Sequence, residues 1–352
     1  MKIHNFGAGP CILPQEVFAK AAAAVLNLNG SGLSVLEISH RSAAFDKIIM
    51  NAQNLVKELL QVPDDYKILF LQGGASLQFS MIPMNFLPEG GSAAYLDTGV
   101  WSSKAIQEAQ LFGNVDVVAS SKDRNYGYIP SGFDVPADVA YFHITTNNTI
   151  YGTEIFEDYD INVPLVADMS SDIFSRKFDV SKYDLIYAGA QKNMGPAGAT
   201  LVIIKDSFLE KKVRKVPSML DYQIHAKNDS LYNTPPVYPI YVSMLNLEWL
   251  KAIGGVEAME ATNVQKAQLL YQEIDRHPLF TGNVEKPFRS RMNVTFSAIN
   301  EDVEKRFLAV CKEKGIHGIK GHRLSGGFRA SIYNALSLSS VEFLVQTMKD
   351  FE

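Results

Sequence analysis

The chain has 352 residues, a formal net charge of -5 and 47% hydrophobic residues. A chain of this length is too long to fold around one small hydrophobic core, so we expect one large and one smaller globular domain. The charge balance argues against nucleic acid and anionic membranes as partners, and no apolar run approaches the ~20 residues of a membrane span. The N-terminus lacks a signal-peptide pattern, and Cys11 and Cys311 have no paired context, so a reducing, cytoplasmic location is expected.

The N-terminal part of the chain predicts an arm followed by two helices. Residues 1–13 are irregular, and an alanine-rich helix is expected from Pro14 to about Asn27. A loop then ends at Ser42, which is a suitable N-cap. Apolar residues recur at helical spacing over 43–60 and predict an amphipathic helix there.

Residues 67–204 alternate apolar runs with helices or loops, which is typical of an α/β domain. Because the runs are apolar throughout, we expect a mainly parallel, seven-stranded sheet that is buried on both faces. Ligands bind at the carboxyl ends of the strands in such sheets. Helices are expected over 74–86 and 101–112, and strands over 67–71, 93–96, 115–119, 139–144, 163–167, 183–188 and 199–204.

The pattern changes after residue 204 and becomes α+β from about residue 255. We therefore predict a large domain over 14–254 and a small C-terminal domain over 255–352. Helices are expected over 238–253, 256–276, 301–314 and from about Ser339, and strands over 292–296, 316–319 and 328–333.

Several common catalytic motifs do not occur in the sequence. There is no phosphate-binding Gly-x-x-x-x-Gly-Lys loop, no Gly-x-Ser-x-Gly elbow and no His-Glu-x-x-His, and Gly7-Ala-Gly9 lacks the third glycine of a dinucleotide fingerprint. The seven histidines are not at metal-ligand spacing, so no metal site is expected. His40 and His322 each precede an arginine, which indicates anion binding instead.

Lys192 lies in a loop of small residues between the last two strands of the predicted sheet. Most lysines are solvent-exposed, but a buried lysine is costly unless it loses its proton, and the neutral amine can condense with an aldehyde. Asp168 ends the strand 163–167, one crossover earlier, and is either a turn residue or a carboxylate that faces a ligand. A lysine for a Schiff base and an aspartate for a pyridine nitrogen are what pyridoxal phosphate chemistry requires.

Three further segments have both a functional and a structural interpretation. Gly74-Ala75-Ser76 opens a helix after a strand and could bind a phosphate, or it is an ordinary tight turn. Trp101 could cover the coenzyme ring, although core tryptophans are more common. Thr149 could bind the phenolic oxygen, or it is a loop or capping residue.

Segments from residue 3 to about 334 resemble, in order, the phosphoserine aminotransferase family of class V aminotransferases. The resemblance implies pyridoxal phosphate fold type I, the aspartate aminotransferase fold, and a homodimer whose active sites lie at the subunit interface. The matching segments are Gly7–Pro10, Ser39–Arg41, Asn147–Gly152, Ala167–Ser171, Gly189–Gly198, Tyr232–Pro236 and Gly321–Asn334.

The resemblance also implies a role for each matching residue, with one pyridoxal 5′-phosphate per subunit bound as a Schiff base to Lys192. Asp168 is implied as the pyridinium partner, Trp101 as the stacking aromatic and Thr149 as the ligand of the phenolic oxygen. The implied phosphate ligands are Ala75, Ser76 and Gln191, with Asn233 and Thr234 from the other subunit. The implied substrate ligands are Arg329 for the α-carboxylate, and His40, Arg41, His322 and Arg323 for the distal anion, where ordinary surface charge is the alternative for each.

The implied reaction is ping-pong transamination between L-glutamate and 3-phosphohydroxypyruvate, giving 2-oxoglutarate and O-phospho-L-serine for serine biosynthesis. 4-Phosphohydroxy-L-threonine for pyridoxine synthesis is a second product that the resemblance allows. Ser76 stands where many family members carry an arginine, so the phosphate cradle is expected to use backbone N–H groups and the hydroxyl. The alternatives are another fold-type I aminotransferase of small or anionic 2-oxo acids, a cysteine desulfurase, for which neither cysteine has the required context, and a phosphate-binding or dinucleotide-binding module without catalysis.

Overall fold

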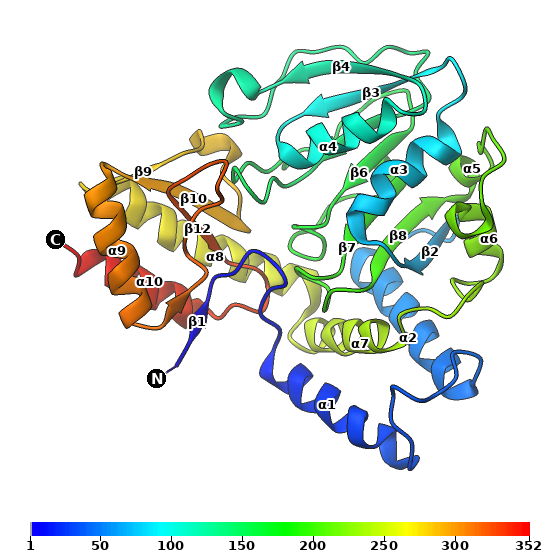
Figure 1. Ribbon diagram of the computed structural model, residues 1–352, viewed down its shortest axis with the longest axis horizontal. Coiled ribbons are helices and arrows are strands. Elements are labelled where there is room, and N and C mark those ends of the chain that lie inside the picture. The colour runs from blue at the N-terminus through cyan, green and yellow to red at the C-terminus, as the bar shows by residue number, and fades with distance from the viewer. Residues whose placement is uncertain (1) are drawn as a thin grey trace.

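A seven-stranded sheet in the order β2-β8-β7-β6-β5-β3-β4 forms the centre of the large domain in this computed structural model, which describes residues 2–352 (Figure 1). The sheet is mainly parallel, as predicted, but β8 runs antiparallel to both of its neighbours, β2 and β7. Its strands are β2 (Tyr66–Leu71), β3 (Ser92–Asp97), β4 (Asn114–Ser120), β5 (Phe142–Thr145), β6 (Leu165–Asp168), β7 (Leu185–Gly189) and β8 (Thr200–Lys205).

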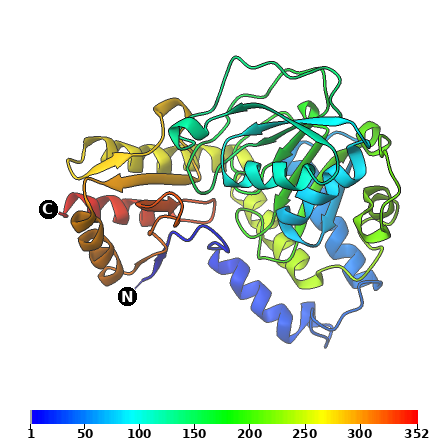
Figure 2. The same cartoon turned by 45° about the horizontal axis from the view of Figure 1, so that its top comes forward.

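Helices cover both faces of this sheet and give a three-layer α/β arrangement (Figure 2). The residues of each central strand alternate between two apolar clusters, one on each face, so the strands are buried throughout. One face is covered by α1 (Gln15–Leu26), α2 (Ala43–Leu60) and α7 (Val237–Ala252). The other face is covered by α3 (Gly74–Phe86), α4 (Val100–Ala109), α5 (Asp206–Leu209) and α6 (Tyr222–Lys227).

The amphipathic helix expected over 43–60 is confirmed as α2, with the expected cap. The Ser42 side chain accepts a hydrogen bond from the backbone N–H of Phe45 at 3.3 Å. This bond satisfies one of the free N–H groups at the helix start. The helix ends at Gln61, whose φ of 54° places it in the left-handed region.

The small domain is built on an antiparallel sheet in the order β12-β10-β9. Its elements are α8 (Gly255–Arg276), β9 (Phe280–Gly282), β10 (Asn293–Ala298), α9 (Glu301–Glu313), β11 (Ile316–His317), β12 (Phe328–Ser331) and α10 (Leu338–Lys349). The beginning of α8 packs in the large-domain core through Val256 and Met259, whereas Leu270 and Ile274 belong to the small-domain core. The predicted boundary near residue 254 therefore falls where a helix shared by both cores begins.

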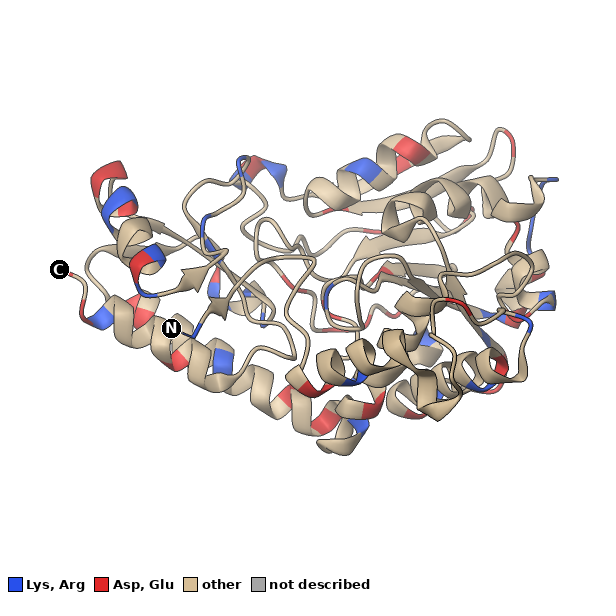
Figure 3. Ribbon diagram, turned by 60° about the horizontal axis from the view of Figure 1, so that its bottom comes forward, with Lys and Arg blue, Asp and Glu red and all other residues tan. Residues whose placement is uncertain are grey.

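The N-terminal arm connects the two domains. Its strand β1 (His4–Asn5) pairs in parallel with β11, so the start of the chain lies against the small domain (Figure 1). In Figure 3, acidic and basic residues are interspersed along the helices, in agreement with the low net charge. None of the helices between residues 2 and 352 has both the length and the apolar character needed to cross a membrane.

Candidate active site

The carboxyl ends of five strands open on one cavity of about 540 Å³. Strands β3, β5, β6 and β7 are parallel, and β2 points in the same direction because it is related to β7 through the antiparallel strand β8. The five strand ends contribute Gly73, Trp101, Thr145, Asp168 and Gln191 to the cavity wall. The cavity is therefore at the edge of the sheet where α/β folds bind ligands.

Lys192 is a buried residue of this cavity and not a solvated loop lysine. Its side chain follows β7, and Nζ donates a hydrogen bond of 2.7 Å to Oγ1 of Thr149. Burial lowers the pKa of Lys192 to about 8, although Asp168 opposes this shift. A substantial fraction of the amine is therefore neutral near pH 7–8, which is the form that attacks a carbonyl carbon.

Asp168 is the last residue of β6, on the strand that neighbours β7, as the spacing in the sequence predicts. Its Oδ1 accepts hydrogen bonds from the backbone N–H of Ser170 at 2.9 Å and from the Ser170 hydroxyl at 2.6 Å. Burial raises the pKa of this carboxyl, while the two bonds from Ser170 and the charge of Lys192 act in the opposite direction. The bonds leave Oδ2 for a cationic partner.

The turn at the start of α3 is suited to hold a phosphate. Gly73 and Gly74 have φ angles of 89° and 65°, and a side chain at Gly73 would collide with Leu77. This turn aims the first N–H groups of α3 at the cavity, where the helix dipole also favours an anion. Ala75, Ser76 and Gln191 line the same wall.

The small domain closes the cavity with His322 and Arg329. Arg329, on β12, donates from Nη1 to the carbonyl of Thr149 at 3.1 Å, and its Nε is buried without a partner. Burial lowers the pKa of His322, and the positive charges of Arg329, Arg323 and Lys104 lower it further. This side of the cavity therefore carries an excess of positive charge, which suits an anionic substrate.

Five of the predicted site residues do not line the cavity in the single chain. The exposed ones are Arg41, Arg323 and Thr234, and the half-buried ones are His40 and Asn233. His40 and Arg41 lie together, with Arg41 Nε 3.4 Å from His40 Nε2. Asn233 lines a separate small pocket, and Thr234 is held by Gln72 through a 3.0 Å bond to its carbonyl.

Thr145 is a polar wall residue that was not predicted. Thr145, the last residue of β5, pairs with Asp168 in the parallel register, and its buried hydroxyl has no hydrogen-bond partner. The signal in the sequence was its place beside Asp168 at a strand end, but the expected strand ended one residue earlier, at 144.

Orphaned polar atoms show that the cavity suits a polar aromatic phosphate such as pyridoxal phosphate. The wall contains three buried groups without partners, the Trp101 indole nitrogen, the Thr145 hydroxyl and Arg329 Nε. Unpaired buried polar atoms are rare unless a ligand satisfies them. Together with the amine, the carboxylate and the cradle, they provide contacts for an aldehyde, a ring nitrogen, a ring face and a phosphate. Residues 2–352 contain no cluster of histidine, cysteine, aspartate or glutamate that could hold a metal ion.

Comparison with known proteins agrees with this geometry. Residues 3–344 match the family model of class-V aminotransferases. The chain is 58% identical to the phosphoserine aminotransferase of Flavobacterium johnsoniae and 56% identical to that of Bacteroides thetaiotaomicron, and each alignment covers 100% of this chain and 99% of the relative. It therefore belongs to the class-V aminotransferase family, and within that family to the phosphoserine aminotransferases.

Solved structures of the same family superimpose closely. The phosphoserine aminotransferase of Bacillus circulans subsp. alkalophilus has a TM-score of 0.97 at 45% identity, covering 99% of this chain and 98% of the other. The enzyme from Trichomonas vaginalis, solved with bound PLP, has a TM-score of 0.95 at 40% identity, covering 99% and 100%. An aspartate aminotransferase of Thermus thermophilus, at 17% identity, a TM-score of 0.81 and coverage of 99% and 100%, shares the fold.

Proposed function

We propose that this protein transfers an amino group from L-glutamate to 3-phosphohydroxypyruvate, giving 2-oxoglutarate and O-phospho-L-serine, with pyridoxal 5′-phosphate bound to Lys192. The single observation that carries the proposal is the cavity in which a lysine with a lowered pKa, Asp168 and Arg329 face one another. Relatives at 54–58% identity over their full length that bear the name phosphoserine aminotransferase support the substrate pair.

Each side chain has a defined task in this proposal. When bound, pyridoxal phosphate withdraws electrons from the substrate and stores the amino group between the two half-reactions. Asp168 keeps the ring nitrogen of the coenzyme protonated, and Trp101 covers the ring. Gly73, Ser76 and the N-terminus of α3 hold the phosphate.

Lys192 acts as general base and acid. Once the substrate amine has replaced it on the coenzyme, the free amine of Lys192 would take the proton from the substrate Cα and release it again as the amino group is transferred. Thr149 holds Nζ at the floor of the cavity through the 2.7 Å hydrogen bond, and so limits the positions that the amine can take. Arg329 binds the α-carboxylate that both substrates share, because a guanidinium matches a carboxylate in geometry as well as in charge.

The distal anion of each substrate would be received by His322 together with Arg323, His40 and Arg41. A phosphate and the side-chain carboxylate of glutamate can use the same group of arginines and histidines. This shared use explains how one cavity could accept two different substrates in turn.

A homodimer would complete the site, with Asn233 and Thr234 of the second copy at the phosphate. These residues do not line the cavity of their own chain, in agreement with a role in another one. Exposed apolar side chains on and after α1 also favour association: Phe18, Leu26, Leu33 and Leu36 are 45–83% exposed. The two unpaired cysteines of the described chain are consistent with a reducing location such as the cytoplasm.

The decisive experiment follows the visible absorption of the purified holoenzyme. L-Glutamate alone should bleach the band and release one equivalent of 2-oxoglutarate per site, and 3-phosphohydroxypyruvate should then restore it and release phosphoserine. Alanine with glyoxylate serves as the control pair. Turnover of the control pair without turnover of the phosphorylated substrate would overturn the assignment in favour of another fold-type I aminotransferase.

The dimer has its own test, which is complementation between two inactive variants. Lys192→Ala and Asn233→Ala/Thr234→Ala chains are co-expressed with different tags. If the sites are shared, a mixed dimer carries one intact site, and random pairing should restore about a quarter of the wild-type activity. Two variants that stay inactive after confirmed pairing would contradict shared sites.

A further inference from the structure

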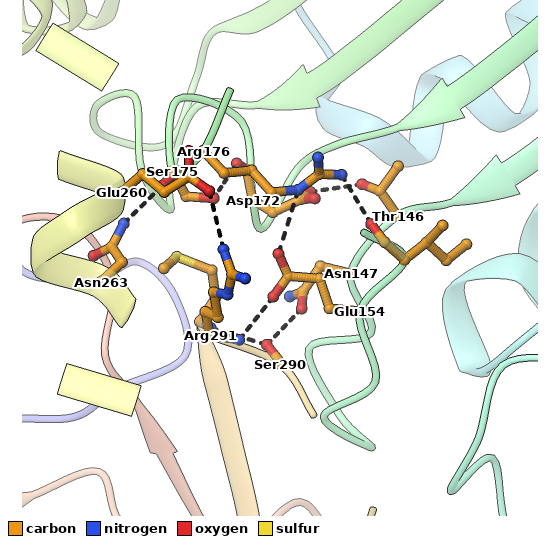
Figure 4. Close-up of polar contacts among 12 residues, drawn as sticks. Thr146, Asn147, Glu154, Asp172, Ser175, Arg176, Glu260, Asn263, Ser290 and Arg291 are labelled. Carbon is orange, nitrogen blue, oxygen red and sulfur yellow. Dashed lines mark hydrogen bonds and ion pairs between the residues drawn. The ribbon is translucent and has the colours of Figure 1, made fainter. Parts of the chain in front are cut away.

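A second group of ionisable side chains, formed by Glu154, Asp172 and Arg176, lies outside the cavity wall (Figure 4). Their residues are 1%, 4% and 5% exposed, and none of them lines the cavity around Lys192. Asp172 and Arg176 belong to the turns that follow β6, and Glu154 belongs to the loop after β5. The proposed chemistry of the site does not use any of these groups.

Thr146 connects this group directly to the strand end that carries Asp168. Its Oγ1 lies 2.6 Å from Oδ1 of Asp172 and 3.1 Å from the backbone carbonyl of Asp168. A hydroxyl has a single proton to donate. When Asp172 is ionised, Thr146 donates to it, and only the 3.0 Å bond from the Thr146 backbone N–H remains on the Asp168 carbonyl. When Asp172 is protonated, it can donate to Thr146, which then donates to the Asp168 carbonyl.

The charges of the group do not balance. Arg176 donates to the carbonyl of Ile155 at 2.8 Å, while its Nε and Oε1 of Glu154 lie 3.5 Å apart and neither atom has a hydrogen bond. Within the group two carboxylates face one guanidinium, and the further positive charges of Arg291 near Glu154 and Lys192 near Asp172 do not outweigh the cost of burying both carboxylates in ionised form. Burial accordingly raises the pKa of Glu154 to about 7 and that of Asp172 to about 6. The site therefore favours a proton on one of the two carboxyls over ionisation of both.

Charged groups face this pair from both domains. Lys192 and Asp168 approach from the cavity, and the ammonium lowers the pKa of Asp172 whereas the carboxylate raises it. The small domain contributes the backbone N–H of Arg291, which donates to Oε2 of Glu154 at 2.7 Å. The remaining neighbours are Arg176 between the two acids, Tyr183 at the start of β7 and Tyr271 on α8.

We propose that Asp172 is a positioning residue for the coenzyme site, which through Thr146 holds the end of β6 that carries Asp168 and adds to the negative charge near Lys192. The proton that it shares with Glu154 moves with the charge on Lys192: loss of the ammonium charge favours uptake of a proton by the pair. The Glu154 contact to Arg291 extends this link to the small domain. The inference deepens the function proposed above and relies on it for the identity of the coenzyme.

The test compares Asp172→Asn with the wild type in the association of pyridoxal phosphate with coenzyme-free protein as a function of pH. Only the neutral amine of Lys192 reacts, so the rate rises through the pKa of Lys192. Because the Asp172 carboxylate stabilises the ammonium, its removal should move the midpoint to lower pH by about half a unit or more. Glu260→Gln, a half-buried partner of Arg291 at the same domain junction, is the matched control and should keep the wild-type midpoint.

A purely structural role for Asp172 would lower stability or rate without moving the midpoint, and a superimposable pH profile would therefore overturn the proposal. If the wild type takes up no coenzyme, the proposed function fails instead, so the two failures are distinguishable.

A second measurement needs no coenzyme and uses Glu154→Gln, which retains Asp172. Carboxyls with raised pKa values bind extra protons in the folded state, so their contribution to stability is lost as pH rises through about 6–7. Urea unfolding of the wild type between pH 5 and 8 should show this loss, and Glu154→Gln should show a flatter profile. Parallel profiles of the two proteins would contradict a shared proton.

Discussion

Nζ of Lys192 donates a 2.7 Å hydrogen bond to Oγ1 of Thr149, so the loop between β7 and β8 is joined to the loop that follows β5. The same loop after β5 accepts a bond from Arg329 of the small domain at the Thr149 carbonyl. Thr149 therefore lies between the two basic groups that the proposed reaction needs most. Its hydroxyl positions the amine, and its carbonyl positions the guanidinium.

Replacement of Lys192 by alanine should abolish both the visible absorption band of the purified protein and transamination. The wall of the cavity, whose residues lie between Ala8 and Arg329, includes no second lysine that could take its place. Absorption spectra and the coupled assay check this outcome. Lys104→Ala is the control, because this exposed lysine lies 4.9 Å from the Trp101 ring yet outside the cavity wall. Normal turnover of Lys192→Ala would refute the scheme.

The rate of coenzyme binding to the wild type should depend on pH through Lys192. Its pKa of about 8 predicts a rate that rises with pH through a midpoint near 8 and levels off about one to two pH units higher, where nearly all of the amine is neutral. A solvated lysine would give a rise that continues towards pH ~10.4. Stopped-flow absorbance over pH 6–10 measures the midpoint. A midpoint near that of a solvated lysine would show that burial does not lower the pKa.

Arg329→Leu should impair both half-reactions. The loss of a charge-assisted bond to the α-carboxylate costs about 1.5–3 kcal/mol, which corresponds to about a tenfold or greater loss in kcat/KM. Single-turnover measurements with glutamate and with 3-phosphohydroxypyruvate separate the two halves. Arg306→Leu, on the outer side of the small domain, is a suitable control. An effect on one substrate alone would contradict the role of Arg329 at the α-carboxylate, because both substrates carry that group.

The double variant Arg41→Ala/Arg323→Ala should weaken the phosphorylated substrate more than glutamate. A phosphate carries more charge than a carboxylate and accepts more hydrogen bonds from arginine. We expect KM for 3-phosphohydroxypyruvate to rise by about tenfold or more, with a smaller change for glutamate. Steady-state kinetics at two ionic strengths measures both constants. An unchanged KM would remove these arginines from the distal-anion site.

Asn246→Ala should loosen the loop that carries Lys192. Nδ2 of this buried residue on α7 donates to the carbonyls of Asn193 and Met194 at 2.9 and 3.0 Å. Two carbonyls left without a partner should cost about 1–3 kcal/mol in the free energy of unfolding. Urea titration of coenzyme-free protein measures this loss, and exposed Asn228→Ala should change it by less than about 0.5 kcal/mol. Equal stability of the two variants would contradict the proposed support.

The residues show why the large domain could be predicted from the sequence. Strands β7 and β8 are continuous apolar runs, and the small-residue loop between them leaves room for Lys192, so the pattern indicated both the sheet and its lysine. The antiparallel direction of β8 has no local signal in the sequence, because a buried strand has the same apolar pattern whether it runs parallel or antiparallel to its neighbours. The strand β9 was missed for a related reason, since its three residues are too few to show an alternation of apolar and polar side chains.

The candidate site was predicted only in part, for physical reasons that differ between residues. Asp168 and Lys192 follow strands that the apolar pattern reveals, but the Glu154–Arg176 contact joins residues that no periodicity connects. The proposed roles of Asn233 and Thr234 require a second copy of the chain, and those two residues were assigned from the family resemblance alone.

The position of the N-terminal arm has a consequence for biosynthesis. Ala8, Gly9 and Pro10 form part of the cavity wall, and Cys11 donates from its Sγ to the carbonyl of Lys192. The arm is fixed, however, by the pairing of His4 with Ile316, and these two residues are separated by most of the chain. A ribosome makes the arm long before it makes the partner strand. The pocket can therefore be completed only after β11 has been synthesised, so prematurely terminated chains that lack β11 cannot form it.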